Sequence, residues 1–217
     1  MIEGFGANTA LLVIDAQCGV NLHEYWGGSG GHRNNLDAEA RIADLLAAWR
    51  AAGGVIYFTF HDSREAASPL KLSLKSGQSL PGLEPIAGEH VIVKDVNSAF
   101  TGTELELSLR REKVTRLVVA GYFTNMCVET TVRAAGNMGY DTYLVQDACA
   151  AGNRATPDGL MFDAEQVHAM SVANLHGEFC TAITTKQAVG LLGADAGDLF
   201  RVQGNELHRG LDVAKAA

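Results

Sequence analysis

The sequence predicts an α/β fold, a three-layer α/β/α domain in which helices cover both faces of a parallel sheet. Short continuous apolar runs recur along the chain, and such runs are typical of strands buried on both faces. Segments with apolar residues at helical spacing separate these runs. Because strands that alternate with helices form right-handed βαβ units, the strands of this chain are expected to be parallel.

Length and composition indicate one domain over residues 1–217. The chain has 217 residues, of which 47% are hydrophobic, and no polar low-complexity linker divides it. No segment approaches the apolar length that spans a bilayer, and residues 1–8 lack the layout of a signal peptide. We therefore expect a cytoplasmic protein without a membrane partner.

Charge and cysteine content narrow the function classes. A net charge of −8 and a pI near 5.3 argue against nucleic acid as a partner, because phosphate contacts need clustered Lys and Arg. The four cysteines are scattered without a CxxC pair. This spacing favours free thiols in a reducing compartment over a disulfide framework or a zinc site.

Six strands and five helices are expected, in alternation. The strands are Thr9–Ile14, Val55–Phe60, His90–Val93, Arg116–Ala120, Asp141–Val145 and Phe179–Thr184. The helices begin at Asp37, Thr103, Cys127, Asp163 and Gln187, and two of them start with capping-box spacing, Thr103 with Glu106 and Asp163 with Gln166. The segments 21–35, 62–89 and 148–162 lack periodicity and are expected to be loops, and residues 198–217 receive no element.

Three reactive side chains each follow a different predicted strand. They are Asp15, Lys94 and Cys127. The carboxyl ends of parallel strands share one edge of a sheet, which is where ligands bind, so the three are expected to meet there. Taken singly, each has a plainer interpretation: a carboxylate that caps a turn, a solvated lysine and a small buried cysteine.

Cys127 is the candidate nucleophile. An apolar run ends at Gly121, a few mixed residues follow, and helical spacing starts at Cys127. A thiol at the start of a helix faces free N–H groups and the positive end of the helix dipole, which lowers its pKa and favours the thiolate.

The motifs around these three residues resemble those of the isochorismatase-like cysteine hydrolases, the superfamily that includes nicotinamidases and N-carbamoylsarcosine amidohydrolases. The matching stretches are LLVIDAQ, EHVIVKDVNSAFTGTEL and VVAGYFTNMCVETTVRAA, followed by GYDTYLVQDACA and the EQVHAM helix. They run in the same order from about Ala10 to Thr185, and together they are specific although each alone would be weak.

The resemblance implies a six-stranded parallel sheet in the order 3-2-1-4-5-6 and a catalytic triad of Asp15, Lys94 and Cys127. It also implies a cis peptide between Tyr122 and Phe123, which would turn the Phe123 N–H toward the Cys127 N–H to form an oxyanion hole. A homodimer or homotetramer is expected on the same ground.

The expected reaction is hydrolysis of a C–N bond in a small amide, carbamoyl compound or ureide, through a thioester intermediate. Asp15 would accept the thiol proton while Lys94 supplies positive charge, and the sulfur would attack the carbonyl carbon. The backbone N–H groups of Phe123 and Cys127 would hold the oxyanion. Asp15 would then protonate the leaving amine and later activate water, with no cofactor.

Nicotinamidases carry an Asp-x-His after the second strand, which helps to bind a divalent metal. The aligned positions here are His61 and Ser63, so we expect no metal. His61, Phe100, Gln17, Trp26 and Tyr122 are the candidate substrate contacts. Histidines and aromatic side chains near strand ends also serve as packing groups, and that alternative stays open for them.

Three other functions are alternatives to the amidohydrolase hypothesis, and the sequence disfavours each of them. Isochorismatase-type hydrolysis of a vinyl ether proceeds by protonation from an Asp and has no use for a thiol, so Cys127 disfavours it. A non-catalytic, ligand-binding member of the fold is disfavoured by the intact set of Asp15, Lys94 and Cys127. A thiol redox protein would need a resolving cysteine beside Cys127, and the sequence has none there.

Overall fold

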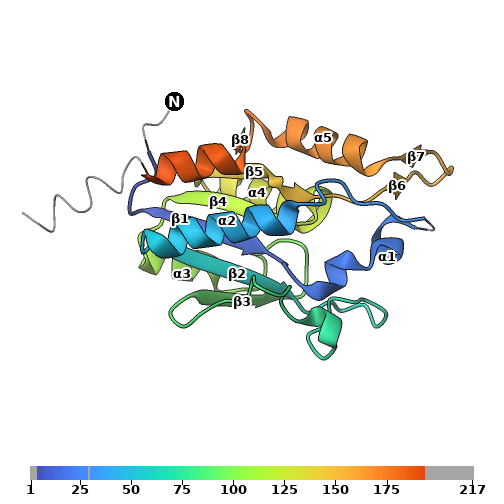
Figure 1. Ribbon diagram of the computed structural model, residues 1–217, viewed down its shortest axis with the longest axis horizontal. Helices are drawn as coiled ribbons and strands as arrows, with labels where there is room; N and C mark the ends of the chain where they lie inside the picture. The colour runs from blue at the N-terminus through green and yellow to red at the C-terminus, as the bar shows by residue number, and fades with distance from the viewer. Residues whose placement is uncertain (1–3, 29, 194–217) are drawn as a thin grey trace, which may run out of the picture.

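The six-stranded parallel sheet that the sequence predicts is present in a computed structural model, which describes residues 4–28 and 30–193 (Figure 1). Its strand order is β3-β2-β1-β4-β5-β8, so the predicted order 3-2-1-4-5-6 is confirmed, with β8 as the sixth strand of the sheet. The strands are β1 (Thr9–Ile14), β2 (Val55–His61), β3 (His90–Lys94), β4 (Arg116–Tyr122), β5 (Asp141–Ala150) and β8 (Thr181–Ile183).

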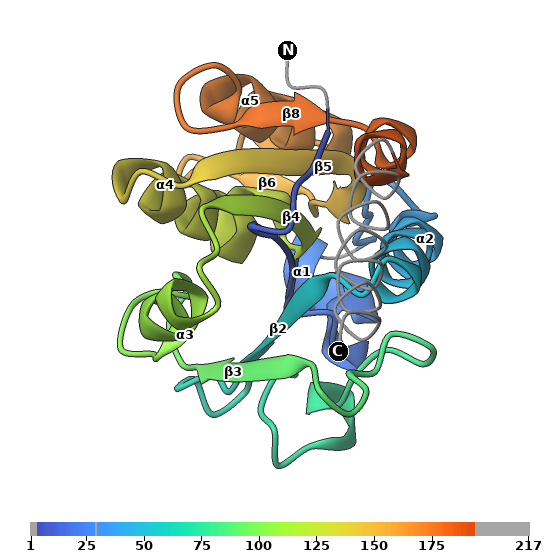
Figure 2. The same ribbon diagram turned by 90° about the vertical axis from the view of Figure 1, so that its left-hand side faces the viewer.

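Helices cover both faces of this sheet (Figure 2). The α-helices are α1 (His23–Gly27), α2 (Ala38–Ala51), α3 (Leu105–Arg111), α4 (Glu129–Asn137) and α5 (Ala164–Leu175), and residues 185–193 are also helical. Short turns of other helix types are η1 (Cys18–Asn21), η2 (Lys75–Gly77) and η3 (Thr124–Val128). No helix within the described part of the chain is both long and apolar enough to cross a bilayer.

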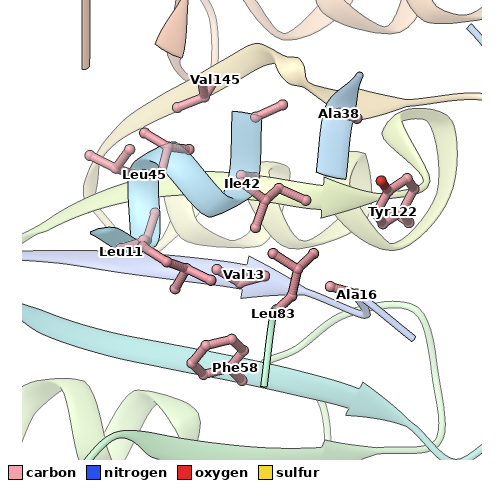
Figure 3. Packing of buried hydrophobic residues seen from close by; sticks show 14 of the residues in the cluster. Leu11, Val13, Ala16, Ala38, Ile42, Leu45, Phe58, Leu83, Tyr122 and Val145 are labelled. Carbon is pink, nitrogen blue, oxygen red and sulfur yellow. The ribbon is translucent and has the colours of Figure 1, made fainter. Parts of the chain in front are cut away.

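The core has two halves, one on each face of the sheet. Leu11 and Val13 of β1 pack with α2 (Figure 3) and with residues 185–193. Leu12 and Ile14 pack with α3 and α4 on the other face. All six residues of β1 are buried, as expected for a central strand covered on both sides. A fully buried Leu or Ile side chain contributes about 1.5–3 kcal/mol to folding. The packing of β1 therefore stabilises the position of Asp15, the residue that follows the strand.

The two predicted capping boxes have different outcomes in the structure. Helix α3 begins at Leu105 with Glu104 as its N-cap residue, and no side chain caps it, so the predicted capping box of Thr103 and Glu106 is wrong. The Thr103 hydroxyl instead donates to the Ala99 carbonyl and accepts from the Leu105 N–H at 3.3 Å, so Thr103 contacts the start of α3 without forming a capping box with Glu106. The capping box of Asp163 and Gln166 is confirmed, with both reciprocal hydrogen bonds formed at 2.8 and 3.1 Å.

The segment 148–162 is more regular than expected. Strand β5 continues to Ala150 because it pairs with β4 beyond a register shift, Gly121 facing Cys149. A small antiparallel pair follows, β6 (Arg154–Ala155) with β7 (Met161–Phe162). Extension of β5 brings the start of this pair to the same edge of the sheet as the ends of β1, β2, β3 and β4.

Candidate active site

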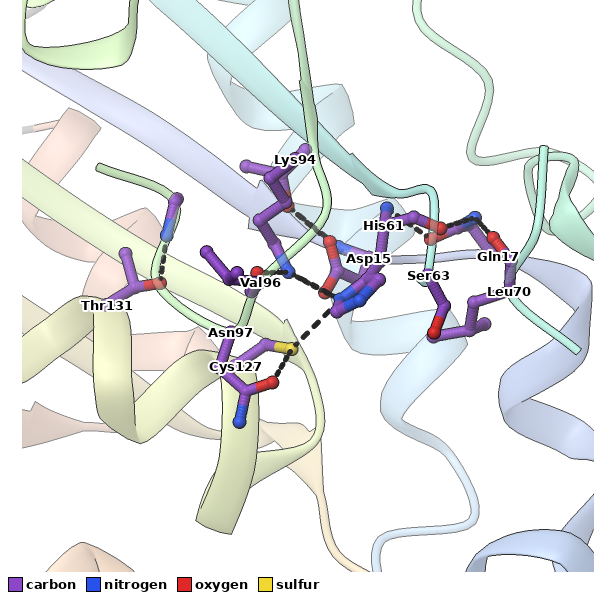
Figure 4. A network of polar contacts seen from close by, with 12 residues as sticks. Asp15, Gln17, His61, Ser63, Leu70, Lys94, Val96, Asn97, Cys127 and Thr131 are labelled. Atoms are coloured by element: carbon purple, nitrogen blue, oxygen red, sulfur yellow. Dashed lines mark hydrogen bonds and ion pairs between the residues drawn. The ribbon is translucent and has the colours of Figure 1, made fainter. Parts of the chain in front are cut away.

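Asp15, Lys94 and Cys127 meet at the carboxyl edge of the sheet, together with His61 (Figure 4). Asp15 directly follows β1, His61 ends β2 and Lys94 ends β3, where it pairs with His61 in the register of the two strands. Cys127 lies in η3, after β4. The ends of four adjacent strands therefore supply all four side chains.

Asp15 and Lys94 form a buried ion pair. The Lys94 Nζ atom lies 2.7 Å from Asp15 Oδ2, and both side chains are at most 1% exposed. Thr59 of β2 donates to Asp15 Oδ1 at 2.6 Å. Burial alone would raise the pKa of Asp15, but the Lys94 charge, together with hydrogen bonds from Lys94 and Thr59, outweighs it and holds this pKa below its ordinary value.

Burial alone would lower the pKa of Lys94, but Asp15 and Cys127 raise it above its ordinary value. Both members of the pair are therefore charged at neutral pH.

The Cys127 thiol is protonated at rest. Burial first, and then the Asp15 carboxylate, raise its pKa above the ordinary value and outweigh the lowering effect of Lys94. The predicted low pKa is therefore corrected. Cys127 lies in the π-helical turn η3, two residues before α4 starts at Glu129, so it is not at the start of an α-helix as predicted. A neutral thiol beside a carboxylate is arranged for proton removal at the moment of attack.

His61 contacts all three of the other groups through one ring nitrogen. Its Nδ1 atom lies 3.0 Å from Lys94 Nζ, 3.6 Å from Cys127 Sγ and 3.8 Å from Asp15 Oδ2. The Lys94 ammonium also donates to the Val96 carbonyl at 3.2 Å. The four side chains thus form one polar network rather than a linear triad.

A cavity of about 700 Å³ opens in front of this network. Cys127 and His61 line it, whereas Asp15 and Lys94 lie behind them and do not reach its surface. Its wall contains apolar, aromatic and sulfur-containing side chains as well as polar and charged ones. The wall comprises Val20, Tyr25, Trp26, Ser63, Arg64, Glu65, Ser68, Leu70, Asp95, Val96, Asn97, Tyr122, Phe123, Met126 and Arg154.

Another cavity, of about 690 Å³, lies at the amino ends of the strands, near Thr9 and Val55. Its lining contains no ionisable side chain. Reactive groups are thus found in the cavity at the carboxyl edge and not in this one, which points to the former as the active site.

Trp26, Tyr122 and His61 line the cavity at the carboxyl edge, and their role as substrate contacts stays a prediction. Phe100 does not, and that assignment is corrected. It lies in the core half beside α3 and α4, and its ring packs against Tyr140 with the centroids 5.9 Å apart.

Gln17 is also outside the cavity wall, and its assignment as a substrate contact is corrected. Its side chain is completely buried, and its Nε2 atom donates to the carbonyl groups of His61, Leu70 and Gly77 at 2.8–3.2 Å. Its Oε1 atom accepts from the His61 N–H at 2.8 Å. The amide therefore fixes the end of β2 and the segment 70–77 instead of binding a ligand.

Sequence reasoning missed two groups that shape the site. Thr59 was not singled out because only the register of β1 with β2 places it beside Asp15. Arg154 follows the GYDTYLVQDACA motif, but no spacing rule connects it with Cys127. Its guanidinium is half-buried in the cavity wall and donates to the Met126 sulfur at 3.1 Å, with no carboxylate partner among residues 4–28 and 30–193. Burial lowers the pKa of Arg154.

Asp15, His61 and Cys127 each offer a potential metal ligand, and the three atoms lie within 4.8 Å of one another. The Lys94 ammonium, however, contacts both the Asp15 carboxylate and His61 Nδ1. A metal ion would place a second positive charge against this ammonium, so the donor set does not suit one.

The peptide bond between Tyr122 and Phe123 is cis, at the position that the resemblance implies. Phe123 and Cys127 both lie at the cavity wall, Phe123 directly before the turn η3 and Cys127 within it. Their backbone N–H groups are the candidate donors to an oxyanion.

A match to a protein-family model confirms the family that the motifs suggest. The family model described as "Isochorismatase domain" matches residues 9–187. The chain belongs to the isochorismatase family. A Bacillus subtilis member, YrdC, is 36% identical over 180 residues, which cover 83% of this chain and 94% of the relative. An isochorismatase-family structure from Chromobacterium violaceum, described as a putative hydrolase, is 39% identical with a TM-score of 0.81, covering 89% of this chain and 99% of that one.

Two further relatives of this isochorismatase-family hydrolase are named for their reactions. Streptothricin hydrolase from Streptomyces noursei is 32% identical over 154 residues, which cover 69% of this chain and 52% of the relative. Ureidoacrylate amidohydrolase RutB from Methylobacterium radiotolerans is 29% identical, and the match covers 80% of this chain and 75% of the relative.

Proposed function

We propose that the protein hydrolyses a C–N bond of a small amide, carbamoyl compound or ureide, with Cys127 as nucleophile and a thioester as intermediate. The observation that carries this proposal is the position of the Cys127 thiol, at the cavity wall and in front of the Asp15–Lys94 ion pair. The carboxylate takes the thiol proton, the sulfur attacks the carbonyl carbon, and Lys94 stabilises the charges that form. The relative named an amidohydrolase supports the same class of bond.

The oxyanion of the tetrahedral intermediate is held by the backbone N–H groups of Phe123 and Cys127. Loss of one such donor in comparable enzymes costs about 3–4 kcal/mol of transition-state stabilisation. The C–N bond then breaks, the amine takes up a proton and leaves, and water cleaves the thioester. A vinyl-ether substrate would be protonated by an acid and would not need the sulfur.

Arg154 supports a substrate that carries an acidic group. Of the other charged groups in the wall, Arg64 is paired with Asp95 at 2.8 Å, and Glu65 is exposed and contacts the Tyr25 hydroxyl at 3.4 Å. Arg154 alone is a half-buried cation whose partner is a thioether, and a carboxylate is the ligand that a guanidinium prefers. The ureido acid in the name of RutB is a substrate of this kind.

The experiment is a panel of amides, carbamoyl compounds and ureides, each as a free acid and as its neutral methyl ester, with ammonia or amine release as the readout. We expect the wild-type protein to turn over at least one member and to have a lower KM for the acid. Cys127→Ala should lower kcat by at least about 10³-fold, because no other group replaces a covalent nucleophile.

Cys18→Ala is the matched control, since Cys18 is partly exposed, lies outside the cavity wall and should be dispensable. If Cys127→Ala kept the wild-type rate, the nucleophile would be wrong. If no member of the panel were turned over, the non-catalytic alternative would be favoured.

A further inference from the structure

We propose that His61 is a catalytic residue, which relays a proton between the buried Asp15 carboxylate and the substrate in the cavity. This inference rests on the proposed function, because it concerns the steps in which an amine leaves and water enters. It gives His61 a part in the reaction beyond binding and beyond the triad of Asp15, Lys94 and Cys127.

The first observation is that the Asp15 carboxylate does not reach the cavity. Asp15 is 1% exposed and lies behind the side chains that line the wall, whereas His61 and Cys127 are both part of that wall. Asp15 can take a proton from the neighbouring thiol, but a leaving amine in the cavity is separated from it. A proton on Asp15 needs an intermediate carrier to reach the amine.

The second observation is the orientation of the His61 ring. Lys94 has only donors, so its 3.0 Å contact with Nδ1 makes this nitrogen an acceptor and assigns the hydrogen to Nε2. Asp15 Oδ2 lies 3.8 Å from the same Nδ1 atom. The Nε2 atom has no hydrogen-bond partner within the described residues, and its ring lines the cavity. The ring thus joins the buried network on one side and the cavity on the other.

The third observation is that the backbone of His61 is fixed. Gln17 accepts from its N–H at 2.8 Å and donates to its carbonyl at 3.2 Å, and β3 pairs with it through Lys94. These bonds fix the backbone of His61, and the 3.0 Å contact of Nδ1 with Lys94 holds the ring, so that the short distances that proton transfer requires are kept.

The relay balances over the whole cycle. In acylation the C–S bond forms, the C–N bond breaks, and the thiol proton moves to Asp15. It continues to His61 Nδ1 while the Nε2 proton goes to the leaving nitrogen, so that the ring changes its tautomer. In deacylation Nε2 accepts a proton from water, the C–O bond forms and the C–S bond breaks. The Nδ1 proton then returns through Asp15 to the sulfur, and every group regains its starting form.

The test compares amide hydrolysis with the cleavage of a p-nitrophenyl ester of the same acid, because p-nitrophenolate leaves without being protonated. For His61→Gln we expect a roughly 10²- to 10⁴-fold lower kcat on the amide, the range of general acid–base catalysis. The p-nitrophenolate burst should stay within a few-fold of the wild-type rate. Acyl-enzyme should accumulate, visible as added mass on the intact protein, because water is no longer activated.

His90→Gln is the control, since His90 begins β3 at the other end of the strand and stacks on Tyr57. If His61→Gln lowered the rate of the p-nitrophenolate burst and the rate of amide hydrolysis by the same factor, the relay would be overturned and His61 would be a positioning residue. Unchanged amide hydrolysis would also overturn it. A wild-type protein that never becomes acylated would overturn the proposed function together with the relay.

Thermal unfolding of His61→Gln and of a second variant, His61→Asn, identifies any loss caused by misfolding. Should both variants fail to fold, the rate of amide hydrolysis by the wild-type protein is measured in mixtures of light and heavy water. A relay predicts a curved dependence of the amide rate on deuterium content, because two protons move together. A linear dependence would overturn it.

Discussion

The two carboxylate oxygens of Asp15 have different environments. Thr59 holds Oδ1 through a hydrogen bond, and Oδ2 faces Lys94 and His61. Asp15 also has a positive φ of 51°, a conformation that non-glycine residues seldom adopt and that costs energy. The firmly packed β1 compensates for this cost, and the chain turns there so that the carboxylate faces the ends of its neighbouring strands.

The Asp15–Lys94 pair should make stability depend on pH in the acid range. The folded pKa of Asp15 is lowered, so its stabilising effect is complete above the unfolded pKa of about 3.9 and is lost as the pH falls through the folded pKa. Urea unfolding from pH 7 to pH 3 should show this loss. Asp15→Asn should be less stable at pH 7 by about 3–5 kcal/mol, because Lys94 is left buried without a partner, and should depend less on pH.

The wild-type and Asp15→Asn curves should therefore converge as the solution becomes acidic. Asp37→Asn is the control: Asp37 forms an exposed ion pair with Arg41, which is worth well under 1 kcal/mol. Parallel curves for wild type and Asp15→Asn would show that the pair does not account for the acid dependence.

The sequence identifies single site residues where both the type of the side chain and its position in the chain indicate a site. Asp15, Lys94 and Cys127 could be found because a reactive side chain directly after an apolar run is unusual. The protonation state of Cys127 could not be predicted, since it depends on burial and on a carboxylate from another strand. Phe100 was misassigned because an aromatic side chain near a strand end looks the same whether it faces the core or a cavity.

At the scale of elements, the close approach of β4 to β1 depends on Gly121. Its φ is +128°, and an added Cβ atom would lie 2.0 Å from the Ile14 carbonyl oxygen. Ile14 is the last residue of β1, directly before Asp15. The glycine thus allows the strands that carry Asp15 and Cys127 to lie side by side up to their ends.

Gly121→Ala should therefore destabilise the fold by roughly 3 kcal/mol and lower activity by misplacing Asp15. Gly139→Ala is the matched control: Gly139 also has a positive φ, of +85°, but an added Cβ would meet nothing within 4 Å. It should cost only the backbone term of about 1–2 kcal/mol. Chemical denaturation measures the loss of stability in both variants. Equal losses in the two would contradict the role of the contact with Ile14.

Most elements follow from their apolar periodicity, because strand and helix faces must match the two halves of one core. What periodicity could not give was the ends of elements. The extension of β5 to Ala150 depends on pairing with β4, and Thr103 forms no capping box with Glu106 because its hydroxyl accepts from the Leu105 N–H instead. Asp163 and Gln166 were predictable as a cap because their partners are local.

At the scale of the whole molecule, the order of the strands determines which side chains meet. Because β1 lies between β2 and β4, residues near positions 15, 61, 94 and 127 converge although they are far apart in the sequence. The homodimer or homotetramer and the cytoplasmic location stay predictions.

The protein should work without any metal ion or cofactor. The Lys94 ammonium already supplies a positive charge among Asp15, His61 and Cys127, where an ion would have to bind. Dialysis against a strong chelator should leave kcat and KM unchanged, and elemental analysis of the active protein should find no stoichiometric transition metal. Loss of activity on chelation, restored by zinc, iron or manganese, would contradict this expectation.

The buried amide of Gln17 has a consequence for attempts to redesign the enzyme. It joins the end of β2 to the segment 70–77 through hydrogen bonds to three carbonyl groups. Libraries that randomise this segment would disturb the histidine at the end of β2 and so harm turnover whatever the ligand. Tyr25 and Trp26 belong to the short helix α1 instead, and they offer a safer place to alter which molecules are accepted.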